Sequence, residues 1–216
     1  MAHRYFSGFY EDYHRAFEGK GENLLHRIIN ILFRRETFEK RAAVVKGFLE
    51  AHGVAGKRLL DLGCGSGEVS LMAARLGARV TGLDVVEGMV ATARRQARES
   101  GLEGVAEFHA ADVTSALLPP SDITLIVSVC EYYTEIADFL TRACDATGEL
   151  LVIVDAGGPW WRRALRYTLA WFKRFHICYR SPEEFAAIVT RAGFAEKERF
   201  RGHSFWALSF RRAPQR

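Results

Sequence analysis

From residue 58 onward, short runs of apolar residues alternate with stretches whose apolar positions recur every three or four residues. The short runs are typical of buried strands, and the periodic stretches are typical of amphipathic helices. We expect strands at 58–62, 78–84, 107–112, 123–129 and 150–154. Such alternation predicts an α/β domain with a mostly parallel sheet and right-handed crossovers. Two last runs, 195–201 and 204–211, predict an antiparallel hairpin that closes the sheet.

Helices are expected between these strands and also before the first one. The expected helices in the α/β part are 68–77, 86–99, 133–146 and 182–192. Ser181 and Pro182 give the clearest start signal, an N-cap followed by proline at the first helical position. Aromatic residues at helical spacing in 3–19 and an apolar face in 24–50 predict two further helices. The predicted organisation is a helical N-terminal cap or flap at 1–53 and an α/β domain at 54–216, with a helical lid insertion at 159–180.

Composition narrows the setting of this fold. The four cysteines are scattered without a Cys-x-x-Cys pair, which argues for reduced thiols and against a zinc or other metal site. The chain has no signal-peptide stretch and no apolar run of roughly 18 residues, so we expect a cytoplasmic protein without a membrane span. The formal net charge of +4 is too small to indicate nucleic-acid binding by itself.

The most specific motif follows the first expected strand. It is Asp61-Leu62-Gly63-Cys64-Gly65-Ser66-Gly67, an acid followed by three glycines two residues apart. A strand, a glycine turn and a helix start present backbone N–H groups to a ligand. A dinucleotide-binding loop has the spacing G-x-G-x-x-G, and its third glycine would stand at Glu68 here. Because the Asp61 carboxylate would repel a pyrophosphate, the motif favours a ligand with an amino group and no phosphate.

This D-x-G-x-G-x-G motif resembles the first motif of the class I S-adenosylmethionine-dependent methyltransferases. Further segments at 84, 112–113, 122–130 and 148–155 fall where that family has its later motifs. The resemblance covers roughly residues 55–212 and implies a Rossmann-like class I methyltransferase fold. That fold has a seven-stranded, mostly parallel sheet with an antiparallel last strand. It also implies S-adenosyl-L-methionine as cofactor, with Asp84 on the ribose hydroxyls and Asp112 and Val113 beside the adenine.

The same resemblance gives the rest of the predicted cofactor site. The cofactor-binding residues are Asp61, Gly63, Cys64, Gly65, Gly67, Asp84, Val85, Met89, Asp112, Val113, Ser128 and Tyr13. Tyr13 comes instead from the aromatic pattern at 3–19, interpreted as a flap whose tyrosine hydroxyl reaches inward; the alternative is an amphipathic helix that packs its aromatic face. Some of these residues could instead have purely structural roles. The glycines could be turn glycines and Cys64 a small spacer. Asp84 could cap the helix that follows it, and Asp112 could cap a short turn.

Methyl transfer from a sulfonium is an in-line displacement, so the protein mainly aligns nucleophile, methyl carbon and sulfur. A carboxylate against the sulfur would stabilise the ground state more than the transition state, so acids are expected at the ribose and the ammonium. The predicted catalytic residues are Glu131, Tyr132 and Tyr133, after the fourth strand. Helix capping by Glu131 and packing by Tyr133 are the structural alternatives. A hydroxyl or amine acceptor gains from a base, whereas a carboxylate acceptor needs none.

The kind of methyl acceptor is predicted from two features: the residues after strand four differ from a motif of amine methyltransferases, and parts of the chain resemble a group of O-methyltransferases. Family amine methyltransferases carry an Asn/Asp-Pro-Pro-Tyr motif after strand four, whereas this chain has Val129-Cys130-Glu131-Tyr132-Tyr133. This departure argues against a nucleobase or amide acceptor. Together with Tyr5-Phe6 and the ending at 202–207, the segment loosely resembles the magnesium-protoporphyrin O-methyltransferase group. This likeness favours methyl transfer to oxygen on a small acidic or aromatic molecule.

A basic, aromatic segment at 159–176 follows the fifth strand, and no acid occurs between Asp155 and Glu183. It has three interpretations: a solvated basic face over a core stripe, a lid for an acidic and partly apolar substrate, or a helix on an anionic membrane surface. Other functions remain open beside the small-molecule methyltransferase. They are an RNA or lipid-associated methyltransferase, a non-catalytic methyltransferase-like module, and a nicotinamide oxidoreductase, which the glycine spacing opposes. The sequence gives no strong nucleic-acid signal and does not indicate an oligomeric state.

Overall fold

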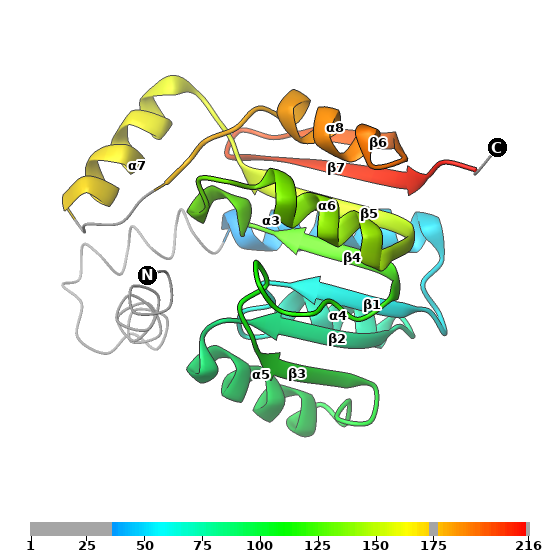
Figure 1. Cartoon of the computed structure of the whole chain (residues 1–216). Helices are drawn as coiled ribbons and strands as arrows, with labels where there is room; N and C mark the ends of the chain where they lie inside the picture. Colours follow the sequence, from blue (N-terminus) through cyan, green and yellow to red (C-terminus); the bar gives the residue numbers. More distant parts are fainter. Residues whose placement is uncertain (1–35, 173–176, 215–216) are drawn as a thin grey trace.

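A computed structural model of the chain describes residues 36–172 and 177–214. Its centre is a seven-stranded sheet with the order β3-β2-β1-β4-β5-β7-β6 (Figure 1). The strands are β1 (Arg58–Leu62), β2 (Arg79–Asp84), β3 (Ala106–Ala110), β4 (Ser121–Val127), β5 (Thr147–Ala156), β6 (Phe194–Arg201) and β7 (Phe205–Arg212). Strands β1 to β5 pair in parallel, whereas β7 runs antiparallel to both β5 and β6. The predicted fold class is confirmed.

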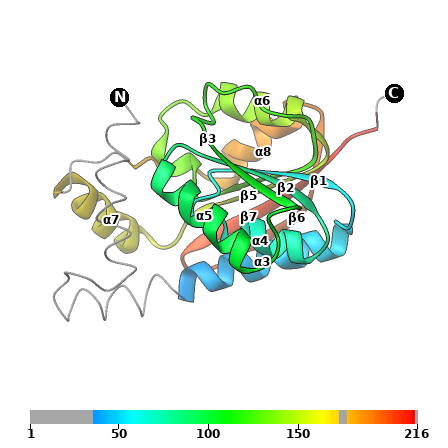
Figure 2. The same cartoon turned by 90° about the horizontal axis from the view of Figure 1, so that it is seen from below.

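Helices cover both faces of the sheet. They are α3 (Glu36–His52), α4 (Glu68–Arg75), α5 (Glu87–Glu99), α6 (Ala137–Ala146), α7 (Trp160–Phe172) and α8 (Pro182–Arg191). Figure 2 shows α3, α4 and α5 on one face and α6 and α8 on the other. Helix α7 stands apart, beyond the carboxyl ends of the strands (Figure 1). None of the helices in the described ranges has the length and apolarity to cross a bilayer.

The alternation of side chains along β1 explains how the two layers are held. Leu60 and Leu62 belong to the apolar cluster under α6 and α8, whereas Leu59 belongs to the cluster under α3, α4 and α5. Successive residues of a strand point to opposite faces, so a strand covered on both sides is apolar almost throughout. Asp61 is the exception, and it points to the same face as Leu59, toward α4.

The largest difference from the predicted elements follows β4. The helix expected at 133–146 begins only at Ala137, and a single 3-10 turn, Cys130–Tyr132, precedes it. Tyr133 itself is extended, with φ −115° and ψ 136°. The physical reason is that distant donors take the carbonyls a helix would use, as described below. Strand β5 also begins earlier than predicted, because Gly148 lies within the strand and does not end the preceding helix.

Other predictions are met closely. Ser181 caps α8 and accepts a hydrogen bond from the Glu184 N–H, and the Glu184 side chain accepts one from the Ser181 N–H. This reciprocal pair satisfies two N–H groups that the first helical turn leaves open. Residues 1–35 of the N-terminal cap or flap predicted at 1–53, including Tyr13, lie outside the described residues, and so do residues 173–176 of the lid insertion.

Candidate active site

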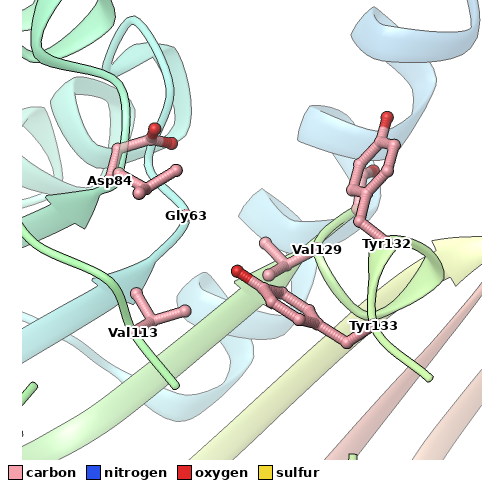
Figure 3. A pocket seen from close by; sticks show the side chains of 8 residues that line it. Gly63, Asp84, Val113, Val129, Tyr132 and Tyr133 are labelled. Carbon is pink, nitrogen blue, oxygen red and sulfur yellow. The ribbon is translucent and has the colours of Figure 1, made fainter. Parts of the chain in front are cut away.

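The order of the strands creates a crevice at their carboxyl ends. Strands β1 and β4 are neighbours, but the chain leaves β1 toward α4 on one face and leaves β4 toward α6 on the other. Open α/β sheets bind ligands at such a switch point. A cavity lies there (Figure 3), and its lining residues are Gly63, Asp84, Val85, Val113, Ser128, Val129, Tyr132 and Tyr133. Seven of these eight residues are among those predicted from the sequence.

The glycine loop forms one wall of the cavity. Gly63 has φ +80°, and a Cβ added there would lie 2.2 Å from Cγ2 of Val129. Both the backbone conformation and the space therefore require glycine. Val129 is the lining residue that the sequence analysis missed, because nothing in the pattern indicates that its methyl group packs against Gly63. Gly67, with φ +84°, stands at the N-cap of α4 and does not line the cavity.

Asp84 ends β2 and fixes the loop from the other side. One carboxylate oxygen accepts the N–H of Gly65 and the other accepts the N–H of Val86, each at 2.9 Å. Burial raises the pKa of this carboxyl, and the two N–H bonds oppose the rise. The first residue of α5 is Glu87 and its N-cap is Val86, so Asp84 bonds the chain just before the helix without being its N-cap. Each oxygen keeps a lone pair that can accept a ligand hydroxyl.

Asp61 lies behind the glycine loop and does not line the cavity. Its side chain is buried and accepts a hydrogen bond of 2.6 Å from the Ser70 hydroxyl of α4. Burial raises the pKa of Asp61 to about 6, and the nearby Asp84 adds to the rise. Asp61 thus ties β1 to α4, and direct contact with a ligand stays a prediction.

The remaining predicted cofactor residues surround the cavity. Val113 lines it, whereas Asp112 accepts hydrogen bonds from the Thr114 N–H at 2.9 Å and the Thr114 hydroxyl at 2.7 Å. These hydrogen bonds are the ones expected if Asp112 caps a short turn, which is the structural alternative to contact with adenine. The buried Cys64 and Met89 lie near the loop without lining the cavity. Within the described ranges, no group of His, Cys, Asp and Glu side chains is arranged to hold a metal ion.

The predicted catalytic residues form the opposite wall, in the turn after β4. Tyr132 and Tyr133 line the cavity, while the buried Glu131 does not. Figure 3 shows the Tyr133 hydroxyl reaching toward the Asp84 side of the cavity and the Tyr132 hydroxyl pointing another way. Burial raises the pKa of Tyr133, and Asp112 and Asp84 raise it further. Tyr133 therefore stays protonated at neutral pH and can donate a hydrogen bond, but it is a poor base.

The structure also brings Arg41 to this wall, which the sequence analysis did not anticipate. Arg41 comes from α3 and donates a hydrogen bond from Nη1 to Ser128, which lies 87 positions away. Ser128 lines the cavity and has φ +60°, a conformation that residues other than glycine rarely adopt. The Arg41 guanidinium lies 5.5 Å from the centre of the Phe205 ring, and its Nε is buried without a hydrogen-bond partner. Across residues 36–172 and 177–214, no carboxylate forms an ion pair with Arg41.

Comparison with known proteins places this site in a family. Residues 59–148 match the family described as a methyltransferase domain. The chain is 32% identical to a ubiquinone biosynthesis O-methyltransferase of Methylobacterium sp. (strain 4-46) over 152 residues, which cover 65% of this chain and 60% of that protein. It is 39% identical to the Ruegeria sp. (strain TM1040) protein of the same name over 97 residues, which cover 45% and 38%. The chain thus spans less than two thirds of the length of these relatives.

A solved structure matches the whole chain in fold. The magnesium protoporphyrin IX methyltransferase from Synechocystis PCC 6803, with bound SAH, superposes with a TM-score of 0.79 over 98% of each chain. The two sequences are 22% identical, so this likeness concerns the fold. The family match, the relatives and the observed strand order agree with the interpretation of the glycine loop. Residues 59–148 carry a methyltransferase domain, and the predicted resemblance to the class I S-adenosylmethionine-dependent methyltransferases is confirmed.

Proposed function

We propose that this protein transfers the methyl group of S-adenosylmethionine to an oxygen atom of a small acidic or aromatic molecule. The observation that carries the proposal is the polarity of the cavity. A buried carboxylate, Asp84, stands at one end, and the Arg41–Ser128 pair stands at the other. The cofactor has a matching polarity, because its ribose hydroxyls donate hydrogen bonds and its amino-acid end carries a carboxylate.

The guanidinium of Arg41 supports this orientation of the cofactor. Arg41 donates a hydrogen bond to Ser128, which lines the cavity, so its positive charge lies beside that end of the cavity. Ion pairs between a guanidinium and a carboxylate are favourable. The amino-acid carboxylate of the cofactor has the matching charge. We therefore assign Arg41 to the methionine end and Asp84 to the ribose end.

The acceptor oxygen enters from the side of Tyr132 and Tyr133. Among the described residues that line the cavity, the ionisable ones are Asp84, Tyr132 and Tyr133. Asp84 is engaged by backbone N–H groups, and Tyr133 holds its proton. This arrangement favours an acceptor oxygen that is already anionic, so we favour a carboxylate over a hydroxyl. Tyr133 then acts as a hydrogen-bond donor that positions the acceptor or the cofactor, and alignment supplies most of the rate.

The relatives support a small-molecule acceptor and oxygen as the atom. The curated relatives are named O-methyltransferases of ubiquinone biosynthesis, and the structural neighbour is named for a porphyrin. The chain spans only part of the former and shares just the fold with the latter, so neither substrate transfers to this protein.

Helix α7 supports a second part of the proposal, contact with an anionic lipid surface. Trp160 and Trp171 are 79% and 73% exposed, and Trp161 is 53% exposed. The sequence of α7 contains three arginines and no acid, and its described arginine, Arg163, is exposed. Exposed tryptophans beside arginines are typical of helices that lie in a membrane interface. A partly apolar acceptor would then be collected from the membrane, which also suits the lid interpretation.

The test begins with binding and ends with product chemistry. Calorimetry should show binding of S-adenosylhomocysteine and no binding of NAD. The protein is then incubated with methyl-labelled S-adenosylmethionine and a panel of aromatic carboxylic acids, phenols and amines. A carboxylate acceptor gives a methyl ester that mild base hydrolyses, whereas a phenol gives a base-stable ether. A labelled amine or RNA product, or cofactor binding without turnover of any acceptor, would overturn the proposed reaction.

A further inference from the structure

The turn that carries the catalytic candidates is weakly held by its own backbone. The N–H of Tyr132 reaches the Val129 carbonyl at 3.2 Å, and the N–H of Tyr133 reaches the Cys130 carbonyl at 3.3 Å. Both distances lie at or beyond the long end of ordinary N–H···O hydrogen bonds. No side chain caps this 3-10 turn. The hydrogen bonds within the turn are therefore too weak to explain why it adopts the conformation in which Tyr132 and Tyr133 line the cavity.

Arg180 supplies the missing support from a distant part of the chain. Its Nη1 donates to the Cys130 carbonyl at 3.2 Å, and its Nη2 donates to the Tyr133 carbonyl at 2.8 Å and to the Thr134 carbonyl. The planar guanidinium presents several donors in a fixed fork, so it can hold three carbonyls in one arrangement. A lysine ammonium has no such fork.

The neighbours of Arg180 reinforce the same contact. The N–H of Cys178 donates to the Glu131 carbonyl at 2.8 Å. Between them, Cys178 and Arg180 take the carbonyls of residues 130, 131, 133 and 134. A helix starting at 133 would need the last two of these for its own first turn, which explains why α6 begins later.

The segment that carries Arg180 is also the return from α7. Tyr179 lies edge-on to Tyr167 of α7, with ring centres 5.3 Å apart. The guanidinium of Arg163, also on α7, lies 5.1 Å from the centre of the Tyr179 ring. The segment that hydrogen-bonds the turn 130–134 therefore also packs against α7.

We propose that Arg180 is a positioning residue, which holds the turn 130–134 in the shape that presents Tyr132 and Tyr133 to the cavity. It acts through three backbone carbonyls and touches neither cofactor nor acceptor. The proposal builds on the proposed function, since the cavity is the cofactor site there. Its first readout is the motion of the turn in the ligand-free protein, which needs no methyl acceptor.

The experiment compares three variants by hydrogen–deuterium exchange of peptides that cover residues 128–136. Arg180→Met removes the fork, Arg180→Lys keeps the charge, and Arg212→Met is the matched control. Arg212 also donates to backbone carbonyls, those of Cys144 and Thr147, but at the amino end of β5. We expect exchange in 128–136 to rise about tenfold or more in Arg180→Met, to rise less in Arg180→Lys, and to match the parent in Arg212→Met.

Titration with S-adenosylhomocysteine gives the functional readout. We expect Arg180→Met to weaken binding about three- to tenfold, because Tyr132 and Tyr133 no longer hold one arrangement around the ligand. Arg212→Met should bind like the parent even if its unfolding temperature falls. Unchanged exchange in Arg180→Met, or an equal rise in Arg212→Met, would overturn the proposal. If Arg180→Met does not fold, the Arg180→Lys exchange decides. A parent protein that does not bind S-adenosylhomocysteine would refute the proposed function, and the exchange result would still stand.

Discussion

The two walls of the cavity are built in different ways. On the cofactor wall, Asp84 bonds Val86 two positions away and Gly65 nineteen positions away, and every partner is a backbone N–H. On the opposite wall, formed by Ser128 and the turn 130–134, Arg180 reaches back 47 and 50 positions and Arg41 reaches Ser128 across 87. The first wall comes from two successive strands and the loops that follow them, whereas the second is held by side chains from distant segments.

Because of this difference, the sequence predicts the conformation of the first wall better than that of the second. The conformation of the glycine loop is encoded where it occurs, because glycine adopts its positive φ angles without the strain that other residues incur. The shape of the turn at 130–134 is encoded elsewhere, in Arg180 and Cys178. A family motif can therefore specify the cofactor, while the acceptor depends on contacts that no short motif contains.

The largest effect is expected at Gly63. Gly63→Ala would place a Cβ 2.2 Å from Val129 in a backbone conformation with φ +80°. We expect it to abolish measurable S-adenosylhomocysteine binding and to cost more than about 3 kcal/mol of unfolding free energy if the loop stays in place. The matched control is Gly88→Ala, since a Cβ there meets nothing within 4 Å. Calorimetry and chemical unfolding measure both variants, and parent-like binding by Gly63→Ala would contradict the assigned loop geometry.

The next effect separates the two ends of the cavity. Asp84→Ala should weaken S-adenosylhomocysteine and 5′-methylthioadenosine alike, by about tenfold or more, because both ligands carry the ribose. Arg41→Met should weaken S-adenosylhomocysteine about fivefold and leave 5′-methylthioadenosine unchanged, because the latter lacks the amino-acid carboxylate. Titration of both variants with both ligands tests this. Equal losses for both ligands in Arg41→Met would remove Arg41 from the methionine end.

A smaller effect concerns the pH dependence of stability through Asp61. Its pKa is raised to about 6 in the folded chain, so the folded protein holds a proton that the unfolded chain releases near pH 4. Ionisation of Asp61 therefore lowers stability as pH rises through this window. Asp61→Asn keeps an acceptor for the Ser70 hydroxyl and removes the ionisation. Its stability relative to the parent should improve by about 1 kcal/mol between pH 5 and pH 7.5.

Urea unfolding of the ligand-free proteins at both pH values measures the Asp61 effect. Asp122→Asn is a useful control, because Arg58 lowers the pKa of the partly exposed Asp122 carboxyl, so this group is ionised in both the folded and the unfolded state over this range and its replacement should give a stability difference that does not change with pH. A stability difference for Asp61→Asn that is flat with pH would mean that the carboxyl ionises as freely in the folded state as in the unfolded one.

The smallest effect is expected at the surface of α7. Trp160→Ser should reduce co-sedimentation with phosphatidylglycerol vesicles about two- to fivefold and leave S-adenosylhomocysteine binding and unfolding temperature unchanged. Neutral phosphatidylcholine vesicles and Leu117→Ser serve as controls, since Leu117 is 95% exposed far along the chain from α7. Equal binding by the parent to both vesicle types would argue for the lid interpretation of α7.

Several predictions from the sequence meet the structure closely because their signals are local. The short apolar run predicted β1 at its observed bounds, and Ser181 with Pro182 predicted the start of α8. Gly63, Asp84, Val113, Ser128, Tyr132 and Tyr133 all reached the cavity that the strand order creates. The predicted helix at 133–146 was wrong at its start, since propensity there is overridden by hydrogen bonds from Arg180.

The amino-acid sequence by itself determined most strands of the sheet, the glycine loop and the acid at the end of β2, because the signal for each lies in a short stretch of neighbouring residues. Only the tertiary structure decided that Asp61 faces Ser70, that Val129 fills the space opposite Gly63, that Arg41 bonds Ser128, and that Arg180 holds the turn 130–134. These contacts join segments far apart in the chain. Their partners are chosen by the packing of the whole sheet, and that choice leaves no local pattern to read.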